Sequence, residues 1–562
     1  MCEETIRKDY LSNILNSKSE KRLIVAGPGT GKTFTFTEII NQNPSDRYLV
    51  MTFINKLVDD LKSQLGDQAD VKTFHSFCIE NLHKIIGDFE ISPVLTNIVK
   101  TDFSIFHDKK PNFEFIFQTL AKKEDEISFF FKCSRYYNVV SFDDSVYFLL
   151  TLLKQNKASI NYDLILIDEY QDFNPLEVDL INKLSESNNI LIIGDDDQAI
   201  YSGRNSSPVH LRELYKNEDY DFFELPYCSR CPKVIIDAVN SFIDEIQSLD
   251  TFNDRIDKKF LPYLTGKEYE NSTYSKIIKA KVPTAKTFGK YILNEIRTIP
   301  TQDIGDSYLN SYPTILIIGQ THYLKEIEKS FRKDGLRFSS QFSATQLATE
   351  IQYYQFFLEN EKSNFSWRLL IELYYNETKI TEILTKANYE THLVDILDKE
   401  FVNSQKKVRD ILIELYKEKS TSEENVTLLK RILGSYFSNI YDYFKKPEDD
   451  NKTVIDKSKP NILLTTFEGS KGLSGGHIFI VGCHNGSMPK IRKDKISDIE
   501  ISKFIVALTR TRKQCHLVTN NWFMNPKDSN GKWLPKFEES YFLSLLPKEI
   551  IEDKGYLKSS DL

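Results

Sequence analysis

The sequence has no long apolar run, no paired set of cysteines and no excess of positive charge. No stretch of about 18 uncharged apolar residues occurs, so we expect no membrane-spanning helix. The first ten residues, MCEETIRKDY, lack an apolar core and carry two glutamates, which predicts a cytoplasmic protein. The seven cysteines are scattered and odd in number, which indicates free thiols in a reducing compartment. Cys228 and Cys231 have the spacing of half a metal site, but no second pair completes it.

The formal net charge of −8 at pH 7 gives no overall basic field that would favour nucleic acids. This is weak evidence against nucleic-acid binding, because a local groove can hold a single strand. Low-complexity tracts and repeats of 20–50 residues are also absent. At 562 residues the chain is too long for one core, so we expect roughly three or four domains.

Continuous apolar runs of strand length recur along the chain and predict an α/β fold. Runs without polar alternation indicate strands buried on both faces, as in parallel sheets covered by helices. The runs form two sets, at 23–27, 48–53, 164–168 and 190–195, and at 314–319, 462–467 and 478–482. Charged and aromatic helix-forming segments interrupt each set. The predicted parts are a first core (1–83 and 159–225), a helical insert (84–158), a second core (226–345 and 456–545), a second helical insert (346–455) and a C-terminal tail (546–562).

A glycine-rich turn lies between an apolar run and a helical pattern in LIVAGPGTGKTFTF, residues 23–36. Its three glycines let the backbone curl around a phosphate with the N–H groups pointing inward. Lys32 is expected to reach the β- and γ-phosphates of ATP, and the Thr33 hydroxyl to bind Mg²⁺. The predicted nucleotide-binding residues are Ala26, Gly27, Pro28, Gly29, Thr30, Gly31, Lys32, Thr33 and Phe34.

Two acidic residues follow another apolar run in LILIDEYQD, residues 164–172. Asp168 is expected to bind the Mg²⁺, and Glu169 to orient or deprotonate the attacking water. An acidic strand exit alone is unremarkable. After a phosphate loop, it indicates a site that hydrolyses a nucleoside triphosphate.

Eight short motifs, in family order, resemble those of the UvrD/Rep-like helicases of superfamily 1. They are AGPGTGKT (26–33), TFINK (52–56), TFHSF (73–77), DEYQD (168–172), GDDDQAIY (194–201), CSR (228–230), TTFEGSKGL (465–473) and VALTRTR (506–512). The resemblance implies an α/β fold with two RecA-like parallel-sheet cores and two inserted, mainly helical subdomains. It also implies ATP and Mg²⁺ between the cores and 3′→5′ movement along single-stranded DNA.

The resemblance also implies roles for single residues of this chain. Gln198 is similar to the γ-phosphate sensor of the first core, with Asp195 in the same turn. Arg230 and Arg510 are similar to the two arginines that reach the γ-phosphate from the second core, although an arginine paired with a surface acid is the plainer alternative. The implied catalytic residues are Lys32, Asp168, Glu169, Gln198, Arg230 and Arg510, and Gly472 joins the nucleotide-binding set.

Contacts with single-stranded DNA are implied in the same way. The residues are Thr52, Phe53, Asn55, Thr73, His75, Tyr201, Arg204 and Thr466. Phe53 would stack on a base, which works for any base; a core aromatic is the alternative there, as is a capping or core histidine at His75. The loop that carries Gln198, Tyr201 and Arg204 would touch nucleotide at one end and DNA at the other, which would couple hydrolysis to stepping.

The chain departs from the family pattern where the base and the DNA are held. It has no glutamine before Gln42, and Phe34 and Ser229 stand where an arginine and a tyrosine usually enclose the base. Gly203 replaces an aromatic residue between Tyr201 and Arg204. These differences predict relaxed nucleotide choice and a weak grip on single strands.

Two functional classes stay open at this point. One is an ATP-dependent 3′→5′ DNA helicase or single-stranded DNA translocase. The other is a DNA-stimulated ATPase that serves as the motor or switch subunit for a protein partner such as a nuclease, in repair or phage defence, with little unwinding alone. The roughly 40 residues after 521 are too few for an appended nuclease domain, so we expect no nuclease activity.

Overall fold

The computed structural model of the protein describes residues 3–44, 46–52, 55–342, 347–445, 456–491, 495–527 and 532–561. The chain folds into two compact units. The first comprises residues 1–77, 159–344 and 455–562, and the second comprises residues 78–158 and 345–454. Within the described ranges, no helix has the length and apolar character needed to cross a membrane.

The first unit contains a six-stranded parallel sheet in the spatial order β3-β2-β6-β7-β1-β8. The strands are β1 (Lys21–Ala26), β2 (Tyr48–Thr52), β3 (Ala69–Thr73), β6 (Leu164–Ile167), β7 (Asn189–Gly194) and β8 (Asp221–Leu225). The four inner strands are the four predicted apolar runs, and they are buried almost throughout. The edge strands β3 and β8 carry polar, partly exposed residues, so apolar continuity did not predict them.

A second, seven-stranded sheet in the same unit confirms the predicted pair of α/β cores. Its spatial order is β13-β14-β12-β15-β16-β11-β17, and all its pairs are parallel. Alternate residues of β15 enter the apolar clusters on opposite faces, Ile478 on one and Phe479 on the other. The strands are β11 (Ile277–Thr284), β12 (Ile315–Ile318), β13 (Ser339–Ser340), β14 (Ile462–Thr465), β15 (Gly475–Val481), β16 (Thr511–Trp522) and β17 (Ile551–Tyr556).

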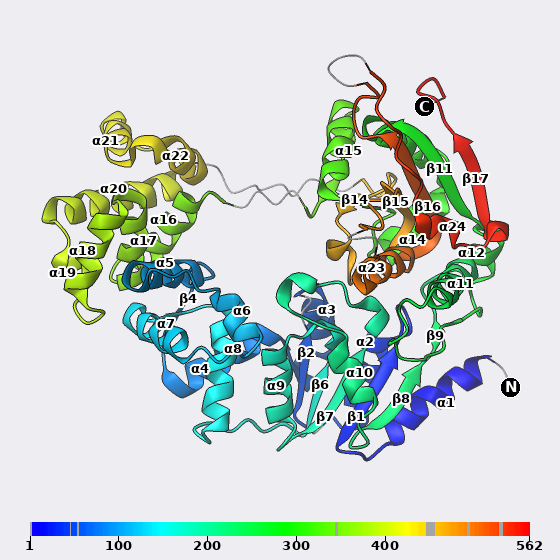
Figure 1. Ribbon diagram of the computed structural model, residues 1–562, viewed down its shortest axis with the longest axis horizontal. Coiled ribbons are helices and arrows are strands. Elements are labelled where there is room, and N and C mark those ends of the chain that lie inside the picture. The colour runs from blue at the N-terminus through cyan, green and yellow to red at the C-terminus, as the bar shows by residue number, and fades with distance from the viewer. Residues whose placement is uncertain are drawn as a thin grey trace. The chain divides into compact units, whose positions relative to one another are not determined.

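The last strand corrects the tail predicted for residues 546–562. β17 pairs with β11, and Figure 1 shows the red β17 beside the green β11. Its sequence, IEDKGY, is polar and mostly exposed, because an edge strand buries little side-chain surface. A short polar strand of this kind has no apolar signal.

Helices and a small two-stranded pairing complete the first unit. In Figure 1 the N-terminal helix α1 lies beside β8, at the edge of the first sheet. The small pairing joins β9 (Tyr227–Cys228) to β10 (Leu261–Pro262). The helices are α1 (Glu3–Asn16), α2 (Lys32–Gln42), α3 (Asn55–Leu65), α4 (Phe74–Ile86, which continues into the second unit), α9 (Pro175–Leu184), α10 (Val209–Tyr215), α11 (Lys233–Ser248), α12 (Glu268–Thr273), α13 (Phe288–Ile296), α14 (Thr301–Leu309), α15 (Thr321–Lys333), α23 (Asp498–Leu508) and α24 (Tyr541–Ser544).

The second unit is mainly helical and combines two segments that are far apart in sequence. Arg368 on α17 and Asp102 on α5 are both fully buried and form an ion pair of 2.8 Å. The Tyr137 hydroxyl donates to the same carboxylate at 2.6 Å, so three helices meet at one buried charge. The elements are α5 (Leu95–His107), α6 (Phe113–Gln118), α7 (Glu124–Tyr137), α8 (Phe142–Lys154), α16 (Thr349–Glu359), α17 (Asn364–Tyr374), α18 (Glu377–Ala387), α19 (Leu393–Ile396), α20 (Lys399–Glu418), α21 (Glu423–Leu433), α22 (Phe437–Lys445), β4 (Glu90–Ile91) and β5 (Val139–Val140).

Candidate nucleotide site

The glycine-rich turn connects β1 to α2 at the carboxyl edge of the first sheet. Gly29 and Gly31 have φ angles of 71° and 100°, which side chains rarely tolerate. The Thr30 hydroxyl donates to the Gly27 carbonyl at 2.9 Å and closes the turn. Lys32 begins the helix, whose first N–H groups have no partner within the helix. The turn and the helix start therefore present backbone donors of the kind that bind phosphate.

Asp168 and Glu169 follow β6 and lie next to Lys32. The Lys32 ammonium contacts Glu169 Oε1 at 3.2 Å, and both side chains are largely buried. Glu169 has a φ angle of 55°, a left-handed conformation that costs energy for a residue with a side chain. Burial raises the pKa of Glu169, but the charges of Lys32 and Lys471 outweigh it and lower the pKa overall. Glu169 is therefore a charged acceptor at neutral pH.

Asp168 has the opposite electrostatic environment. Burial, and then the neighbouring Glu169 carboxylate, raise the pKa of Asp168. A bound cation would offset both effects. The donors available here are the Asp168 carboxylate and the hydroxyl of Thr33 in the first turn of α2, and such oxygen ligands suit Mg²⁺. The residues thus fit the predicted metal.

A chain of buried hydrogen bonds leads from Glu169 to Gln198. Gln171 Nε2 donates to Glu169 Oε2 at 2.6 Å, and Gln171 Oε1 accepts from the Asp195 backbone at 3.0 Å. Gln198 Nε2 then donates to Asp195 Oδ2 at 2.6 Å. Sequence analysis gave Gln171 no role, although it lies in the DEYQD motif. The Gln171 amide bonds Glu169 at one end and Asp195 at the other. It therefore fixes Glu169 relative to the loop that carries Gln198, called the sensor loop below.

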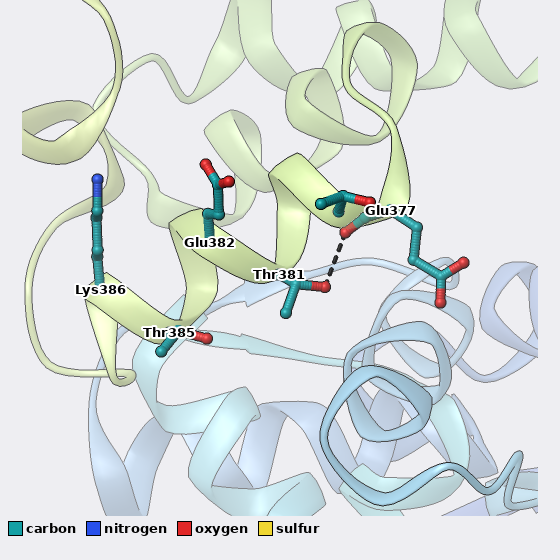
Figure 2. Close-up of a pocket in the computed structure, with 6 residues that line it drawn as sticks. Glu377, Thr381, Glu382, Thr385 and Lys386 are labelled. Carbon is teal, nitrogen blue, oxygen red and sulfur yellow. Dashed lines mark hydrogen bonds between the residues drawn. The ribbon is translucent and has the colours of Figure 1, made fainter.

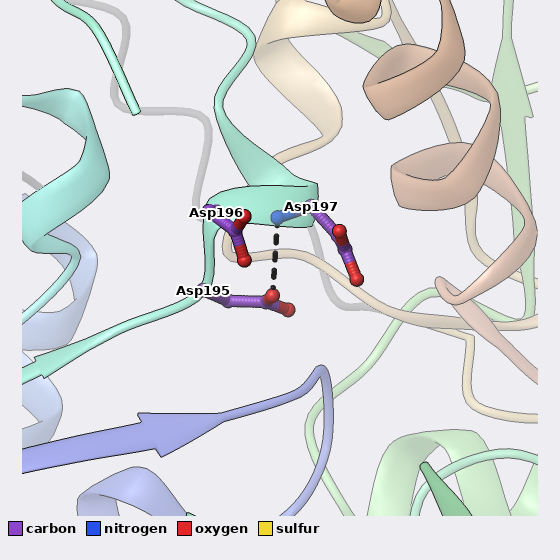
Figure 3. A group of neighbouring side chains, drawn as sticks. All are labelled: Asp195, Asp196 and Asp197. Atoms are coloured by element: carbon purple, nitrogen blue, oxygen red, sulfur yellow. Dashed lines mark hydrogen bonds between the residues drawn. The ribbon is translucent and has the colours of Figure 1, made fainter. Parts of the chain in front are cut away.

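The three aspartates after β7 are buried and form a cluster of ion pairs. Figure 3 shows Asp195, Asp196 and Asp197 around the start of this loop, with the Asp197 N–H donating to Asp195 at 3.2 Å. Lys258 contacts all three carboxylates, including Asp195 at 2.7 Å and Asp197 at 3.0 Å. Arg255 pairs with Asp197 at 2.7 Å. The three carboxylates are close enough together to hold a metal ion, but Lys258 and Arg255 already neutralise them.

Arg510 reaches this loop from the second sheet. Its Nη2 donates to Gln198 Oε1 at 3.0 Å, and its other nitrogens donate to the carbonyls of Val506 and Leu473. In the described part of the chain, no carboxylate lies within 4 Å of this guanidinium. Burial, and then Arg230, lower the pKa of Arg510. A buried cation that has only neutral acceptors is poised to receive an anion.

The segment before α11 places Arg230 against the phosphate loop. Ser229 donates its backbone N–H to the Gly29 carbonyl at 3.0 Å. A β-carbon on Gly29 would come within 2.5 Å of the Arg230 β-carbon, so only glycine fits there. Arg230 Nη1 donates to the Thr509 carbonyl at 3.4 Å. Gly472, the remaining predicted nucleotide residue, has a φ angle of 77° and precedes the carbonyl that Arg510 contacts.

Lys471 is a second cation from the second sheet, and sequence analysis gave it no role. Its ammonium bonds Asp172, donates to the Gln198 carbonyl at 2.9 Å and lies 3.6 Å from Glu169. Lys471 and Asp172 belong to two of the quoted motifs, and their separation of 299 residues concealed the pairing. The SKGL and DEYQD motifs therefore meet directly.

The residues predicted to contact DNA lie in part at the carboxyl edge of the first sheet. Thr52 and Thr73 are paired at the ends of β2 and β3, with Thr52 fully buried. Burial lowers the pKa of His75 to about 4, with Arg204 adding to the effect, so the imidazole is neutral at pH 7. Phe53 and the side chain of Asn55 lie outside the described residues.

The remaining predicted DNA contacts bond other parts of the protein. The Tyr201 hydroxyl donates to the Glu468 carbonyl at 3.0 Å, which links the sensor loop to the second sheet. Arg204 pairs with Glu177 at 2.8 Å. Thr466 accepts the Gly469 N–H at 3.1 Å and lines a hollow of about 220 Å³. The structure therefore brings Tyr201 to the second core but shows Arg204 held by an acid.

A cavity of about 510 Å³ adjoins the phosphate loop, on the side of α1. The Arg7 guanidinium lies 4.6 Å from the centre of the Tyr263 ring, and Phe34 is 53% exposed into the same space. Tyr10 and Tyr227 line it as well and contact each other edge to face. A cavity of this size, with aromatic walls and one arginine, suits a flat ring.

A separate hollow of about 640 Å³ runs along α18 in the second unit. Figure 2 shows that its labelled residues all come from this one helix, where Thr381 donates to the Glu377 carbonyl at 2.8 Å. Glu382, Thr385 and Lys386 are exposed. One open helix face without a buried polar group does not make a ligand site.

Comparison with known proteins shows which proteins this chain is similar to. A family profile described as an AAA domain matches residues 12–204, and the viral superfamily 1 RNA helicase core domain matches residues 139–287. The ATP-dependent DNA helicase Rep of Buchnera aphidicola (subsp. Schizaphis graminum) is 24% identical over 88% of this chain and 90% of its own length. The chain is therefore similar to the UvrD/Rep-like helicases of superfamily 1 over most of its length.

Other relatives align with this chain over similar lengths. A probable DNA helicase II homolog of Mycoplasma capricolum is 24% identical over 92% of this chain and 84% of its own. The ATP-dependent DNA helicase PcrA of Staphylococcus aureus is 22% identical over 94% of this chain and 85% of its own. These alignments cover 92% and 94% of the chain, so the likeness is not confined to the phosphate loop.

Proposed function

We propose that this protein is a helicase that hydrolyses ATP between its two sheets and uses the energy to move 3′→5′ along single-stranded DNA. The observation that carries the proposal is the contact of Arg510, from the second sheet, with Gln198 of the first. It places an anion-seeking guanidinium beside the phosphate loop and its acids. The DNA substrate is inferred from the names of the relatives, and the polarity from the family resemblance.

The geometry of these residues supports the following catalytic roles. Lys32 and the N–H groups at the start of α2 hold the β- and γ-phosphates. Thr33 and Asp168 would hold Mg²⁺, which would supply a Lewis acid for the phosphate oxygens. Glu169, charged and fixed by Gln171, accepts a proton from the attacking water. Arg510 stabilises the charge that develops on the γ-phosphate.

The same contacts couple hydrolysis to movement. Gln198 belongs to the first core but is held by Arg510 and Lys471 of the second. Three residues further on, Tyr201 bonds the turn that begins at Thr466. The sensor loop thus contacts both the nucleotide site and the residues expected to bind DNA. Binding of either ligand would therefore shift the conformation of this loop.

The function is tested by ATPase assays with and without single-stranded DNA, with Glu169→Gln beside the wild type. We expect single-stranded DNA to raise the wild-type rate, and the substitution to lower kcat by about 10²–10⁴-fold, since it removes the proton acceptor but keeps the side-chain shape. Turnover by the variant at the wild-type rate would contradict the role of Glu169.

Strand polarity is tested with duplexes that carry a 3′ or a 5′ single-stranded tail. The proposal expects unwinding, or displacement of a bound protein, only from the 3′ tail. Gly203 is exposed, and nothing lies within 4 Å of where its β-carbon would be, so no aromatic platform stands at this position. Unwinding by the protein alone is therefore expected to be short, and a processive partner-free reaction would contradict a weak grip.

We place the nucleobase in the cavity lined by Arg7, Phe34 and Tyr263. Stacking on aromatic faces does not read base edges, so GTP and CTP are expected to compete with ATP. Tyr263→Ala removes one wall and is expected to raise KM for ATP by about 5–100-fold with kcat little changed, because a stacked base is worth about 1–3 kcal/mol. Phe222→Ala on the edge strand is the matched control and should leave KM unchanged. Strict selection of ATP would overturn this reading.

A further inference from the structure

Cys228 and Cys231 are the ends of a Cys-x-x-Cys turn, and neither thiol has a part in the nucleotide chemistry above. Their exposed fractions are 0% and 2%. The turn joins β9 to the 16-residue helix α11, and the Cys231 N–H donates to Cys228 Sγ at 3.5 Å. A strand, this turn and a long helix are the local arrangement that supports thiol–disulfide chemistry.

The turn packs on the phosphate loop. The backbone N–H and the hydroxyl of Ser229 both donate to the Gly29 carbonyl, at 3.0 and 3.3 Å. A β-carbon on Gly29 would lie 3.1 Å from Cys228 Sγ. A displacement of this sulfur would therefore shift the phosphate loop, because the two are in close contact.

The other side of the turn contacts the second sheet. Cys231 Sγ donates to the Thr509 carbonyl at 3.4 Å, and Arg230 Nη1 donates to the same carbonyl at 3.4 Å. Thr509 precedes Arg510. The two cysteines thus bracket one candidate arginine and bond the residue before the other.

The two thiols differ in acidity in the way that disulfide formation requires. Burial raises the pKa of Cys228, but hydrogen bonds from Cys231 and the charge of Arg230 outweigh it and lower the pKa to about 6. Burial raises the pKa of Cys231 well above its usual value. At neutral pH, Cys228 is the thiolate nucleophile and Cys231 remains a thiol.

We propose that Cys228 and Cys231 are a reversible oxidation site, at which hydrogen peroxide forms a disulfide that slows ATP turnover. The Cys228 thiolate attacks one peroxide oxygen, so an S–O bond forms, the O–O bond breaks and hydroxide leaves. The Cys231 sulfur then attacks the Cys228 sulfenic acid, so the S–S bond forms and water leaves with the Cys231 proton. An external dithiol reverses the reaction by thiol–disulfide exchange. The effect on turnover rests on the proposed ATPase function, whereas the disulfide itself does not.

The disulfide changes the contacts that hold the turn. Its sulfurs lie about 2.05 Å apart, and Cys231 can no longer donate a hydrogen bond to Thr509. Arg230, between the two cysteines, must move with them. Because a displacement of about 1 Å at a catalytic group costs up to about 10²-fold in rate, kcat is expected to fall by about 10–100-fold.

The test treats the full-length protein with hydrogen peroxide, alkylates the remaining thiols and digests with trypsin without reduction. Trypsin cleaves after Arg230, so the two cysteines fall on separate peptides, residues 217–230 and 231–233. A disulfide keeps these peptides linked, and mass spectrometry detects the linked mass and its loss on reduction. ATP turnover is measured on the same samples before oxidation, after oxidation and after addition of dithiothreitol.

The proposal expects linked peptides, lower turnover and recovery of both on reduction. Cys231→Ser is expected to give no linked peptide and to leave Cys228 as a sulfenic acid that dimedone traps, whereas Cys133→Ala, a buried cysteine in the other unit, should behave as wild type. Absence of the linked peptides overturns the site, and linked peptides with unchanged turnover overturn its regulatory effect. A reduced wild type without ATPase activity would instead count against the proposed function.

Discussion

Arg510→Ala is expected to lower kcat for ATP hydrolysis by about 10³–10⁵-fold, the range measured for arginines that stabilise phosphoryl transfer. The side chain is buried beside Gln198, and its described partners are two carbonyls, an amide and the Thr509 hydroxyl, with no carboxylate. Its charge is therefore available to the γ-phosphate. Steady-state ATPase assays at saturating single-stranded DNA measure the change in kcat.

Two further variants separate charge from geometry and from general damage. Arg510→Lys keeps a cation but loses the planar fork, so we expect it to recover only a small part of the rate. Arg512→Ala is the matched control, because Arg512 lies two residues away on β16 and bonds Ser474 instead of the sensor loop. Its kcat should stay within a few-fold of wild type. An Arg510→Ala rate within ten-fold of wild type would remove the arginine from the mechanism.

The contact between Arg510 and Gln198 also predicts non-additive effects. If both groups act on the same phosphate as a unit, the double variant Arg510→Ala with Gln198→Ala should be little slower than the worse single variant. Independent roles would instead make the two losses multiply. Binding of a non-hydrolysable ATP analogue, measured separately, shows whether the substitutions act on chemistry or on affinity.

The inner strands of both sheets were predictable because they are buried on both faces, which leaves a continuous apolar run in the sequence. The edge strands β3, β8 and β17 carry polar residues and left no such run. The phosphate loop was equally predictable, since its glycines and Lys32 lie close together in the sequence. Local chemistry and complete burial are the two properties that sequence reading captures well.

Pairings over long distances in sequence were not predictable. Lys471 meets Asp172 across 299 residues, and Lys258 meets Asp196 across 62, so neither pair forms a local pattern. The partners of the acids of 195–197, Lys258 and Arg255, are also distant in sequence. The base cavity likewise combines Arg7 with Tyr263, two residues outside every quoted motif. Such contacts follow from the topology of the sheets and not from spacing.

Replacing Arg368 with methionine is expected to destabilise the second unit by about 3–5 kcal/mol, since it leaves the Asp102 carboxylate buried without its partner. Asp102 is fully buried, and burial already raises its pKa despite the opposing charge of Arg368. Hydrogen exchange measured by mass spectrometry on peptides from α5 and α17 reports this directly. We expect exchange there to become about 10²–10⁴-fold faster, while peptides from the first unit keep their rates.

The pH dependence of this penalty distinguishes a lost ion pair from a lost packing contact. Without Arg368 the pKa of Asp102 rises further above that of the unfolded chain, so the folded state binds the proton more tightly. The penalty is then largest at neutral pH and shrinks as the pH falls and Asp102 becomes protonated in the folded state. Adding Asp102→Asn removes the buried charge and should restore most of the protection, whereas Lys379→Met, which breaks an exposed pair, should change nothing. A penalty that is independent of pH and persists in the double variant would mean that Arg368 stabilises the unit by packing, and not by neutralising Asp102.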